Sequence, residues 1–384
     1  MPVPFFDIHY NLDEATRLSL LARWARILEH GGFVNGPEVR ELEAALRALL
    51  GVRYALGCSN GSDALVLCLR ALDVGPGDEV IVPAFTFFAS AGAVARTGAT
   101  PVFADVDPAT YCLDPRSAAA KVTPRTKAVL PVHLYGRAAE LPAIRAAVDA
   151  AAGRRLAIVE DAAQAIGTAH PAYVVGAFGE AAGWSCFPTK NLGAPGDAGF
   201  VTSEDEARAE RMKRLREHGG GRQYHHDEVG FNFRMDSLQA AGLLQHLPRL
   251  VEFNAARRVG AEHYAHLFHE AGLSAEQGGP ITLPEITPGH AVHQYVIRLR
   301  ERDALRAFLG ERKVGCAVYY PLGLHLQPCF AALGGKRGDL PHTERASAEV
   351  LALPIYPGVT RAQREEVVAG IAACYAAMPT AVRK

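Results

Sequence analysis

Residues 155–162, "RLAIVEDA", form a short apolar run with two carboxylates, Glu160 and Asp161, near its end. A run of this kind, without alternating polar residues, is typical of a strand buried on both faces. Helix-length segments such as 62–72 and 141–152 separate it from other runs of the same type. The expected strands are 53–58, 79–84, 100–106, 127–133, 155–162, 183–187 and 193–203. The alternation predicts an α/β fold with a mostly parallel central sheet, whose ligands bind beyond the carboxyl ends of the strands.

The chain has 384 residues, which exceeds the usual size of one compact core. We expect a large domain over residues 1–250 and a smaller C-terminal α+β domain over 251–384, divided within a long helical stretch. In the smaller domain we expect strands at 293–300 and 315–321 and helices at 301–312 and 361–378.

The composition limits the partners of the protein. A net charge of −1 argues against nucleic acid or an anionic membrane surface as the main partner. Seven scattered cysteines without a C-x-x-C motif indicate reduced thiols in a cytoplasmic protein, and neither a disulfide framework nor a metal site. No window approaches the roughly 18 apolar residues that span a bilayer, and we see no signal peptide.

Lys190 stands at an unusual place in "WSCFPTKNLG" (184–193), directly behind an expected buried strand. Only seven of the 40 basic residues are lysine, so a lysine here suggests chemistry that arginine cannot perform. A desolvated lysine amine can lose its proton and then form a Schiff base or move protons. The alternative is a lysine that extends past the strand end to the surface.

Two further groups belong with Lys190. Asp161 ends the expected strand at 155–162, and "SNGSDALVL" (59–67) is a glycine-containing turn that opens a helix, where a phosphate can bind. Each has a plainer explanation as a helix N-cap. Together they are the parts that hold pyridoxal 5′-phosphate: a phosphate site, a carboxylate for the ring nitrogen and a lysine for the aldehyde.

With these groups, the sequence resembles the DegT/StrS-type sugar aminotransferases, which are pyridoxal-phosphate enzymes of fold type I. The matching blocks run through most of the chain: "GPEVRELEAAL" (36–46), "SNGSDAL", "VPAFTFFASAGAVARTGATPVFADVDPATY" (82–111), "PVHLYG" (131–136), "VEDAAQAIG" (159–167), "FPTKNLGAPGDAGFV" (187–201), "VGFNFRMDSLQAA" (229–241), "YYPLGLHLQP" (319–328) and "LPIYPG" (353–358). The resemblance implies ping-pong transfer of an amino group from glutamate or glutamine to a keto sugar, most often a nucleotide-linked 3- or 4-keto-deoxy sugar.

The resemblance also implies residue roles. Lys190 carries the cofactor as a Schiff base and moves the proton, and Asp161 pairs with the pyridinium nitrogen. Gln164 lies near the 3-hydroxyl, and Phe87, with Phe88 as the alternative, stacks on the ring.

For the phosphate, the resemblance implies a group of four residues: Gly61, Ser62, Asp63 and Ser185. Asn232 reaches the phosphate of the neighbouring subunit's cofactor, which implies a homodimer with shared active sites.

Substrate contacts are harder to place. Tyr320, His325, His218 and Arg222 could face the sugar or its diphosphate, or could be structural. A keto-cyclitol acceptor is the alternative substrate, because the cofactor residues would be the same. A sugar dehydratase, in which histidine replaces the lysine, and a non-catalytic regulatory homologue are further alternatives that the retained Lys190 disfavours.

Overall fold

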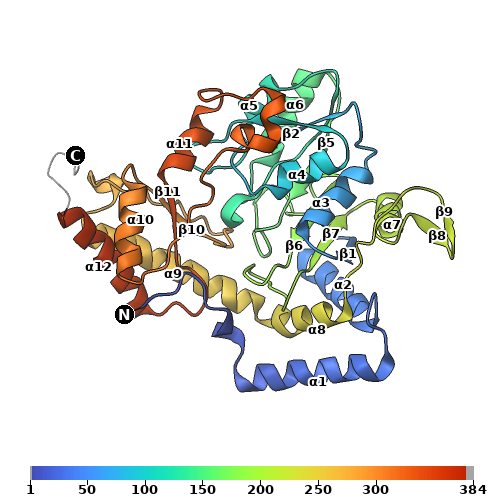
Figure 1. The fold of residues 1–384 in the computed structure, drawn as a ribbon, viewed down its shortest axis with the longest axis horizontal. Helices are drawn as coiled ribbons and strands as arrows, with labels where there is room; N and C mark the ends of the chain where they lie inside the picture. The colour runs from blue at the N-terminus through green and yellow to red at the C-terminus, as the bar shows by residue number, and fades with distance from the viewer. Residues whose placement is uncertain (1, 378–384) are drawn as a thin grey trace.

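The computed structural model describes residues 2–377, built around one seven-stranded sheet (Figure 1). The strand order is β1-β7-β6-β5-β4-β2-β3, and only β7 runs antiparallel to its neighbours. The strands are β1 (Tyr54–Cys58), β2 (Glu79–Pro83), β3 (Thr100–Ala104), β4 (Thr126–Val129), β5 (Ala157–Asp161), β6 (Ala181–Ser185) and β7 (Gly199–Ser203). The prediction of an α/β fold with a mostly parallel sheet is therefore confirmed.

Helices and loops cover both faces of the sheet. Its helices are α2 (Pro37–Leu50), α3 (Gly61–Arg70), α4 (Ala89–Arg96), α5 (Pro115–Ala120), α6 (Leu141–Ala152), α7 (Glu206–Leu215) and α8 (Ser237–His246). Alternate residues of β6 enter different cores: Ala181 packs with α3, whereas Ala182 and Trp184 pack with α2 and α8. Trp184 stacks on Phe200 of β7, with ring centroids 5.2 Å apart. Burial on both sides explains why these strands read as continuous apolar runs.

A second core lies beyond the sheet, around α9 (Leu250–Glu270). It contains β10 (Tyr295–Arg298), α10 (Arg302–Glu311), β11 (Val350–Leu353) and α12 (Arg361–Ala377), with β10 and β11 paired antiparallel. The helix α11 (Pro341–Glu349) instead packs against the core of the large sheet through Ala346. Val3 also packs into this core. The division of the chain at residue 250 stays a prediction. Met378, the last residue of the expected final helix, lies outside the described residues.

One long helix and one short hairpin lie at the periphery of the molecule. α1 (Glu14–His30) runs along the edge of the molecule below α8, and the short hairpin β8 (Gly220–Arg222) and β9 (His225–His226) protrudes near α7 (Figure 1). Short 3-10 turns are η1 (Ile8–Asn11), η2 (Leu134–Gly136), η3 (Leu247–Arg249), η4 (Ala275–Gln277), η5 (Leu324–Leu326) and η6 (Pro328–Leu333). No helix among residues 2–377 is long and apolar enough to cross a membrane.

One expected strand, 315–321, is wrong. Its backbone groups bond to several separate partners instead of to one ladder. Gly315 N donates to Val3 O, Ala317 pairs with Ala352 in an isolated bridge, and Tyr319 O accepts a bond from the Tyr135 hydroxyl. The place beside β10 is taken by β11, from residues 350–353.

Candidate active site

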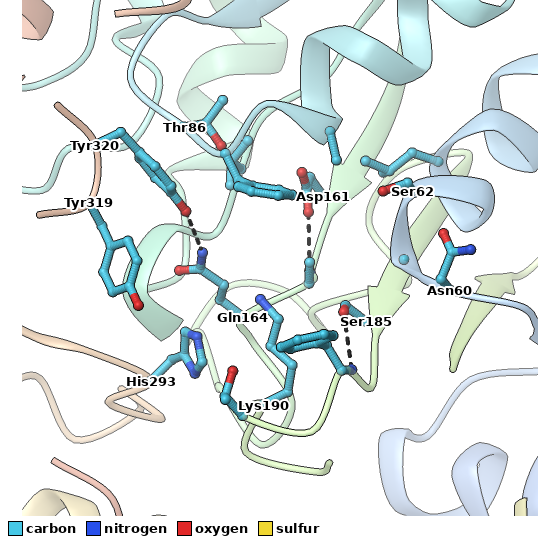
Figure 2. Close-up of a pocket in the computed structure, with 18 of the residues that line it drawn as sticks. Asn60, Ser62, Thr86, Asp161, Gln164, Ser185, Lys190, His293, Tyr319 and Tyr320 are labelled. Atoms are coloured by element: carbon cyan, nitrogen blue, oxygen red, sulfur yellow. Dashed lines mark hydrogen bonds between the residues drawn. The ribbon is translucent and has the colours of Figure 1, made fainter. Parts of the chain in front are cut away.

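A cavity of about 870 Å³ opens at the carboxyl ends of the sheet strands (Figure 2). It brings together nine of the residues singled out in the sequence: Gly61, Ser62, Asp63, Phe87, Asp161, Gln164, Ser185, Lys190 and Tyr320. These residues come from segments more than 250 positions apart. The individual roles assigned to them stay predictions.

Lys190 follows β6 in a turn closed by a 2.8 Å bond from its backbone N to Phe187 O. Within residues 2–377 its amine has no hydrogen bond or ion pair. Removal from bulk water lowers the pKa of Lys190 to about 8, although the negative charge of Asp161 acts in the opposite direction. A larger fraction of this amine is therefore neutral, and able to attack a carbonyl, than for an ordinary lysine.

Asp161 is the last residue of β5, and its side chain is only 4% exposed. Ser90 Oγ donates to Oδ2 at 2.7 Å, and the Ala163 backbone N donates to Oδ1 at 3.1 Å. Because Ser90 Oγ donates its proton to Asp161, Thr86 Oγ1 donates to Ser90 at 3.1 Å. Burial raises the pKa of Asp161, and these bonds only partly offset it. A cationic ring nitrogen would stabilise the carboxylate.

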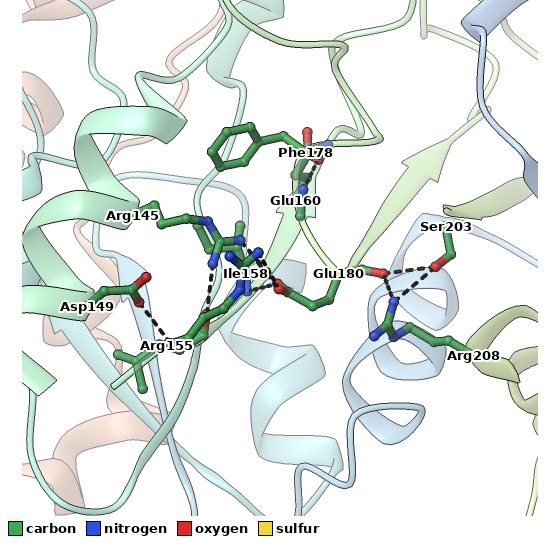
Figure 3. A network of polar contacts seen from close by, with 11 residues as sticks. Arg145, Asp149, Arg155, Ile158, Glu160, Phe178, Glu180, Ser203 and Arg208 are labelled. Atoms are coloured by element: carbon green, nitrogen blue, oxygen red, sulfur yellow. Dashed lines mark hydrogen bonds and ion pairs between the residues drawn. The ribbon is translucent and has the colours of Figure 1, made fainter. Parts of the chain in front are cut away.

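Glu160, one residue earlier, points to the opposite face of β5 and is fully buried. Its carboxylate accepts bonds of 2.8–3.0 Å from His133 Nε2 and from the backbone N of Gly176, Phe178 and Gly179. His133 Nδ1 accepts from Ala139 N at 3.0 Å, so the ring proton lies on Nε2. Figure 3 shows this side of β5, where the Glu160 carboxylate fixes the loop at residues 176–179.

The turn before α3 has the form of an anion cradle. Asn60 caps the helix by accepting from Asp63 N at 2.9 Å, and the first amides of the helix have no intrahelical acceptor. A Cβ on Gly61 would lie 2.6 Å from Ser185 Cβ, so glycine permits the close approach of the two segments. The residues present therefore fit a bound phosphate group.

Arg96 was not identified from the sequence. It lines the cavity from α4, pairs with Asp63 at 2.8 Å, and lies over the Phe233 ring at 5.3 Å. Its position depends on the packing of α4 beside the 60–63 turn, which no local pattern reveals.

Gln164 and Tyr320 lie on the other side of Lys190. Gln164 Oε1 accepts from Tyr135 N at 2.7 Å, and its Nε2 donates to the Tyr320 hydroxyl at 3.2 Å. These bonds fix the orientation of the amide. Phe87 and Phe187 line the cavity with half of their surface exposed.

Four expected residues do not line this cavity: Asn232, His325, His218 and Arg222. Asn232 Oδ1 accepts a bond from Arg234 Nε at 2.9 Å, and His218 and Arg222 line a separate, open hollow at the β8–β9 hairpin. His325 is 3% exposed and bonds to Glu344 at 3.3 Å. Within residues 2–377 no group of His, Cys, Asp or Glu side chains could hold a metal ion.

The arrangement of an unpaired lysine, a buried carboxylate and an anion cradle agrees with a match to a family model. The model of the DegT/DnrJ/EryC1/StrS aminotransferase family matches residues 16–372. The chain belongs to this family. The predicted family and the prediction of an aminotransferase are thereby confirmed.

Two curated relatives cover nearly the whole chain. A "pleiotropic regulatory protein" of Geobacillus stearothermophilus is 44% identical over 98% of this chain and 99% of the relative. A UDP-N-acetyl-3-dehydro-α-D-glucosamine 3-aminotransferase of Acidithiobacillus ferrooxidans is 42% identical over 96% of each chain.

Two solved structures share the fold at high overlap. DesV of S. venezuelae, crystallised in complex with a ketimine intermediate, has a TM-score of 0.91 and 39% identity, covering 98% of this chain and 99% of that chain. NtdA of Bacillus subtilis, crystallised with bound cofactor PMP, has a TM-score of 0.88 and 32% identity, covering 97% and 85%.

Proposed function

We propose that the protein is a pyridoxal-phosphate-dependent aminotransferase that transfers an amino group from glutamate or glutamine to a nucleotide-linked 3-keto sugar. One observation carries the proposal: the unpaired Lys190 amine, the buried Asp161 and the cradle at residues 60–63 share one cavity. The PMP-bound and ketimine-bound relatives support the cofactor.

When bound, the cofactor supplies an electron sink that acidifies the carbon bearing the amino group. Asp161 would hold the ring nitrogen through its charge, and the 60–63 turn with Ser185 would hold the phosphate. Gln164, fixed by Tyr135 and Tyr320, would orient the ring. Lys190 would hold the carbonyl carbon of the bound cofactor and, when its amine is free, would move the proton during transfer. The amino donor leaves as a keto acid before the keto sugar enters the same cavity.

The relative that acts on a 3-dehydro sugar nucleotide supports position 3 as the carbon that receives the amino group. A keto-cyclitol remains the alternative acceptor, because the cofactor residues would serve it equally. The cavity of about 870 Å³ is at the upper end of the range of small-molecule sites, which suits a large substrate.

We further propose that a second copy of the chain completes the site. Large apolar side chains are exposed beside the cavity and along α1: Phe87, Phe88, Phe187, Leu18, Leu21 and Leu28. Asn232 lies outside the cavity of its own chain, as expected if it serves the neighbouring one. Light scattering should give twice the chain mass, and a monomer that transaminates at full rate would contradict the shared site.

The cysteines support a reducing, cytoplasmic location. All seven are free, and most are buried. Thiols in this state are typical of intracellular proteins.

The activity is tested by the two half-reactions. Glutamate added to the cofactor-loaded protein should bleach the visible absorbance and release 2-oxoglutarate, and a keto sugar nucleotide should then restore the absorbance. Borohydride reduction followed by peptide mass spectrometry should place the cofactor on Lys190. A protein that loads the cofactor but is unchanged by glutamate and glutamine would refute the aminotransferase and favour a regulatory role.

A further inference from the structure

His293 lies just before β10 and lines the same cavity as Lys190, although no sequence pattern indicated it. Its side chain is 5% exposed. In Figure 2, His293, Tyr319 and Tyr320 lie on one side of Lys190, whereas Asn60, Ser62 and Ser185 lie on the other. The second side is the anion cradle, so we take the His293 side as the one that a substrate would reach.

Two asparagines determine which ring nitrogen of His293 carries the proton. Asn191 Nδ2 donates to Ala291 O at 3.0 Å and to Asn254 Oδ1 at 2.8 Å, and Asn254 Nδ2 donates to Ile166 O at 3.0 Å. The carbonyl oxygens can only accept, so both amides are fixed in orientation.

Asn191 Oδ1 is therefore an acceptor, and it lies 3.0 Å from His293 Nδ1. Nδ1 must donate this bond and carries the ring proton. Burial and the positive charges of Lys190 and Arg257 lower the pKa of His293 well below its ordinary value. The ring is therefore neutral, and its Nε2 presents a lone pair that has no hydrogen bond from any of residues 2–377.

We propose that His293 Nε2 accepts a hydrogen bond from a hydroxyl of the keto sugar, next to the carbonyl that receives the amino group. The proposal rests on the proposed function and adds a substrate-binding residue to it. A sugar is rich in hydroxyl donors, whereas the carboxylates of glutamate have no proton to donate to a neutral acceptor. His293 thus binds the acceptor substrate and contributes little when glutamate is the amino donor.

The kinetic test separates the two atoms of the ring. In His293→Asn the amide nitrogen can keep the bond to Asn191, but nothing reaches the position of Nε2. In His293→Gln the amide reaches the position of Nε2 but not that of Nδ1. We expect His293→Asn to raise KM for the keto sugar about tenfold and to leave the glutamate half-reaction within about twofold. His293→Gln should recover part of the loss.

His290→Gln is the matched control, since His290 is also buried but does not itself line this cavity, and the glutamine amide can keep the bond that His290 Nε2 donates to Tyr135 O. It should leave both parameters unchanged. An unchanged KM in His293→Asn, or equal losses in both half-reactions, would overturn the proposal and leave a structural role.

The tautomer is tested without substrate. In the NMR spectrum of the cofactor-loaded protein with ¹⁵N-labelled histidine, the signals of His293 are those that are missing from His293→Asn. They should show an unprotonated Nε2 and should not titrate between pH 6 and 8. A protonated Nε2 or a titrating ring would overturn the proposal. Failure of the unsubstituted protein to aminate any keto sugar would instead refute the proposed function, and the NMR result would stand apart from it.

Discussion

Two neighbouring carboxylates at the end of β5 lie in very different surroundings. Glu160 and Asp161 are adjacent carboxylates, both buried, on opposite faces of β5. On its face of the strand, both carboxylate oxygens of Glu160 accept hydrogen bonds from residues that the structure describes. Nearby, Glu180 bonds to Arg145, Arg155 and the Ile158 backbone N, and its own carbonyl accepts from Arg208 and Ser203 (Figure 3).

The Asp161 face differs in that its most reactive groups lack partners. The Lys190 amine and His293 Nε2 have no hydrogen bond among the described residues, and burial raises the pKa of Asp161 itself. Polar groups that stabilise a fold are satisfied internally, whereas a ligand site keeps groups unsatisfied until the ligand arrives. The two faces should therefore respond differently to substitution.

The largest effect is expected at Lys190. Lys190→Ala or Lys190→Arg should lower turnover at least about 10³-fold, because no neighbouring group can replace the amine in holding the cofactor and moving the proton. The thermal midpoint of the apoprotein should stay the same or rise, since the amine has no partner to lose. Lys213→Ala, on the exposed side of α7, is the control and should be fully active. Near-normal turnover of Lys190→Ala would reject the assignment.

On the Glu160 face of β5, we expect substitution to reduce the stability of the protein. Glu160→Ala leaves His133 and three backbone amides without an acceptor, and should destabilise the protein by about 3 kcal/mol. Thermal or urea unfolding measures the loss. Glu180→Gln, in which the side chain is partly exposed, should lose much less. If Glu160→Ala unfolds like the parent protein, the comparison between the two faces fails.

Cofactor attachment should depend on pH through Lys190. Its pKa of about 8 means that the neutral amine decreases about tenfold for each pH unit below that value. The rate of covalent loading of the apoprotein should therefore rise steeply from pH 6 to 8 and level off above, as followed by absorbance.

Asp161→Asn sharpens this test. The negative charge of Asp161 raises the pKa of Lys190, so its removal should move the onset of the plateau to lower pH. A loading rate that is independent of pH would show that Lys190 does not limit the reaction.

The smallest effect is expected at Ser90. Ser90→Ala removes the 2.7 Å bond that favours the charged form of Asp161, so the pKa of the carboxyl should rise further. Cofactor affinity, measured by equilibrium dialysis, should fall several-fold at pH 7 and more at pH 5.5. Thr86→Val, one bond further from Asp161, should have a weaker effect. Equal losses in both variants would point to packing as the cause.

Much of the sheet could be predicted from the sequence, because burial on both faces leaves an uninterrupted apolar run. The strand at 155–162 and the helix Leu141–Ala152 follow directly from such local patterns. The strand expected at 315–321 was wrong because apolar, β-prone residues do not determine pairing. β11 satisfies the edge of β10, and residues 315–321 bond elsewhere.

For the same reason, only some of the residues that line the cavity could be predicted from the sequence. Asp161 stands out as a charged residue at the end of an apolar strand, and Lys190 as a charged residue just behind another. His293 did not, because its tautomer depends on Asn191 and Asn254, which are far from it along the chain. Arg96 and Ser90 likewise follow from where α4 packs.

The period of two in β5 has a further consequence. Adding or removing one residue within Ala157–Asp161 would rotate the strand end by half a turn and exchange the faces of the two carboxylates. Glu160 would then lose the backbone amides that bond to it, and Asp161 would no longer face the cavity. A change in the length of this strand should therefore be far less tolerated than a substitution. In a scan of single-residue deletions across the sheet, deletions in β5 should cause the largest loss of folded, active protein.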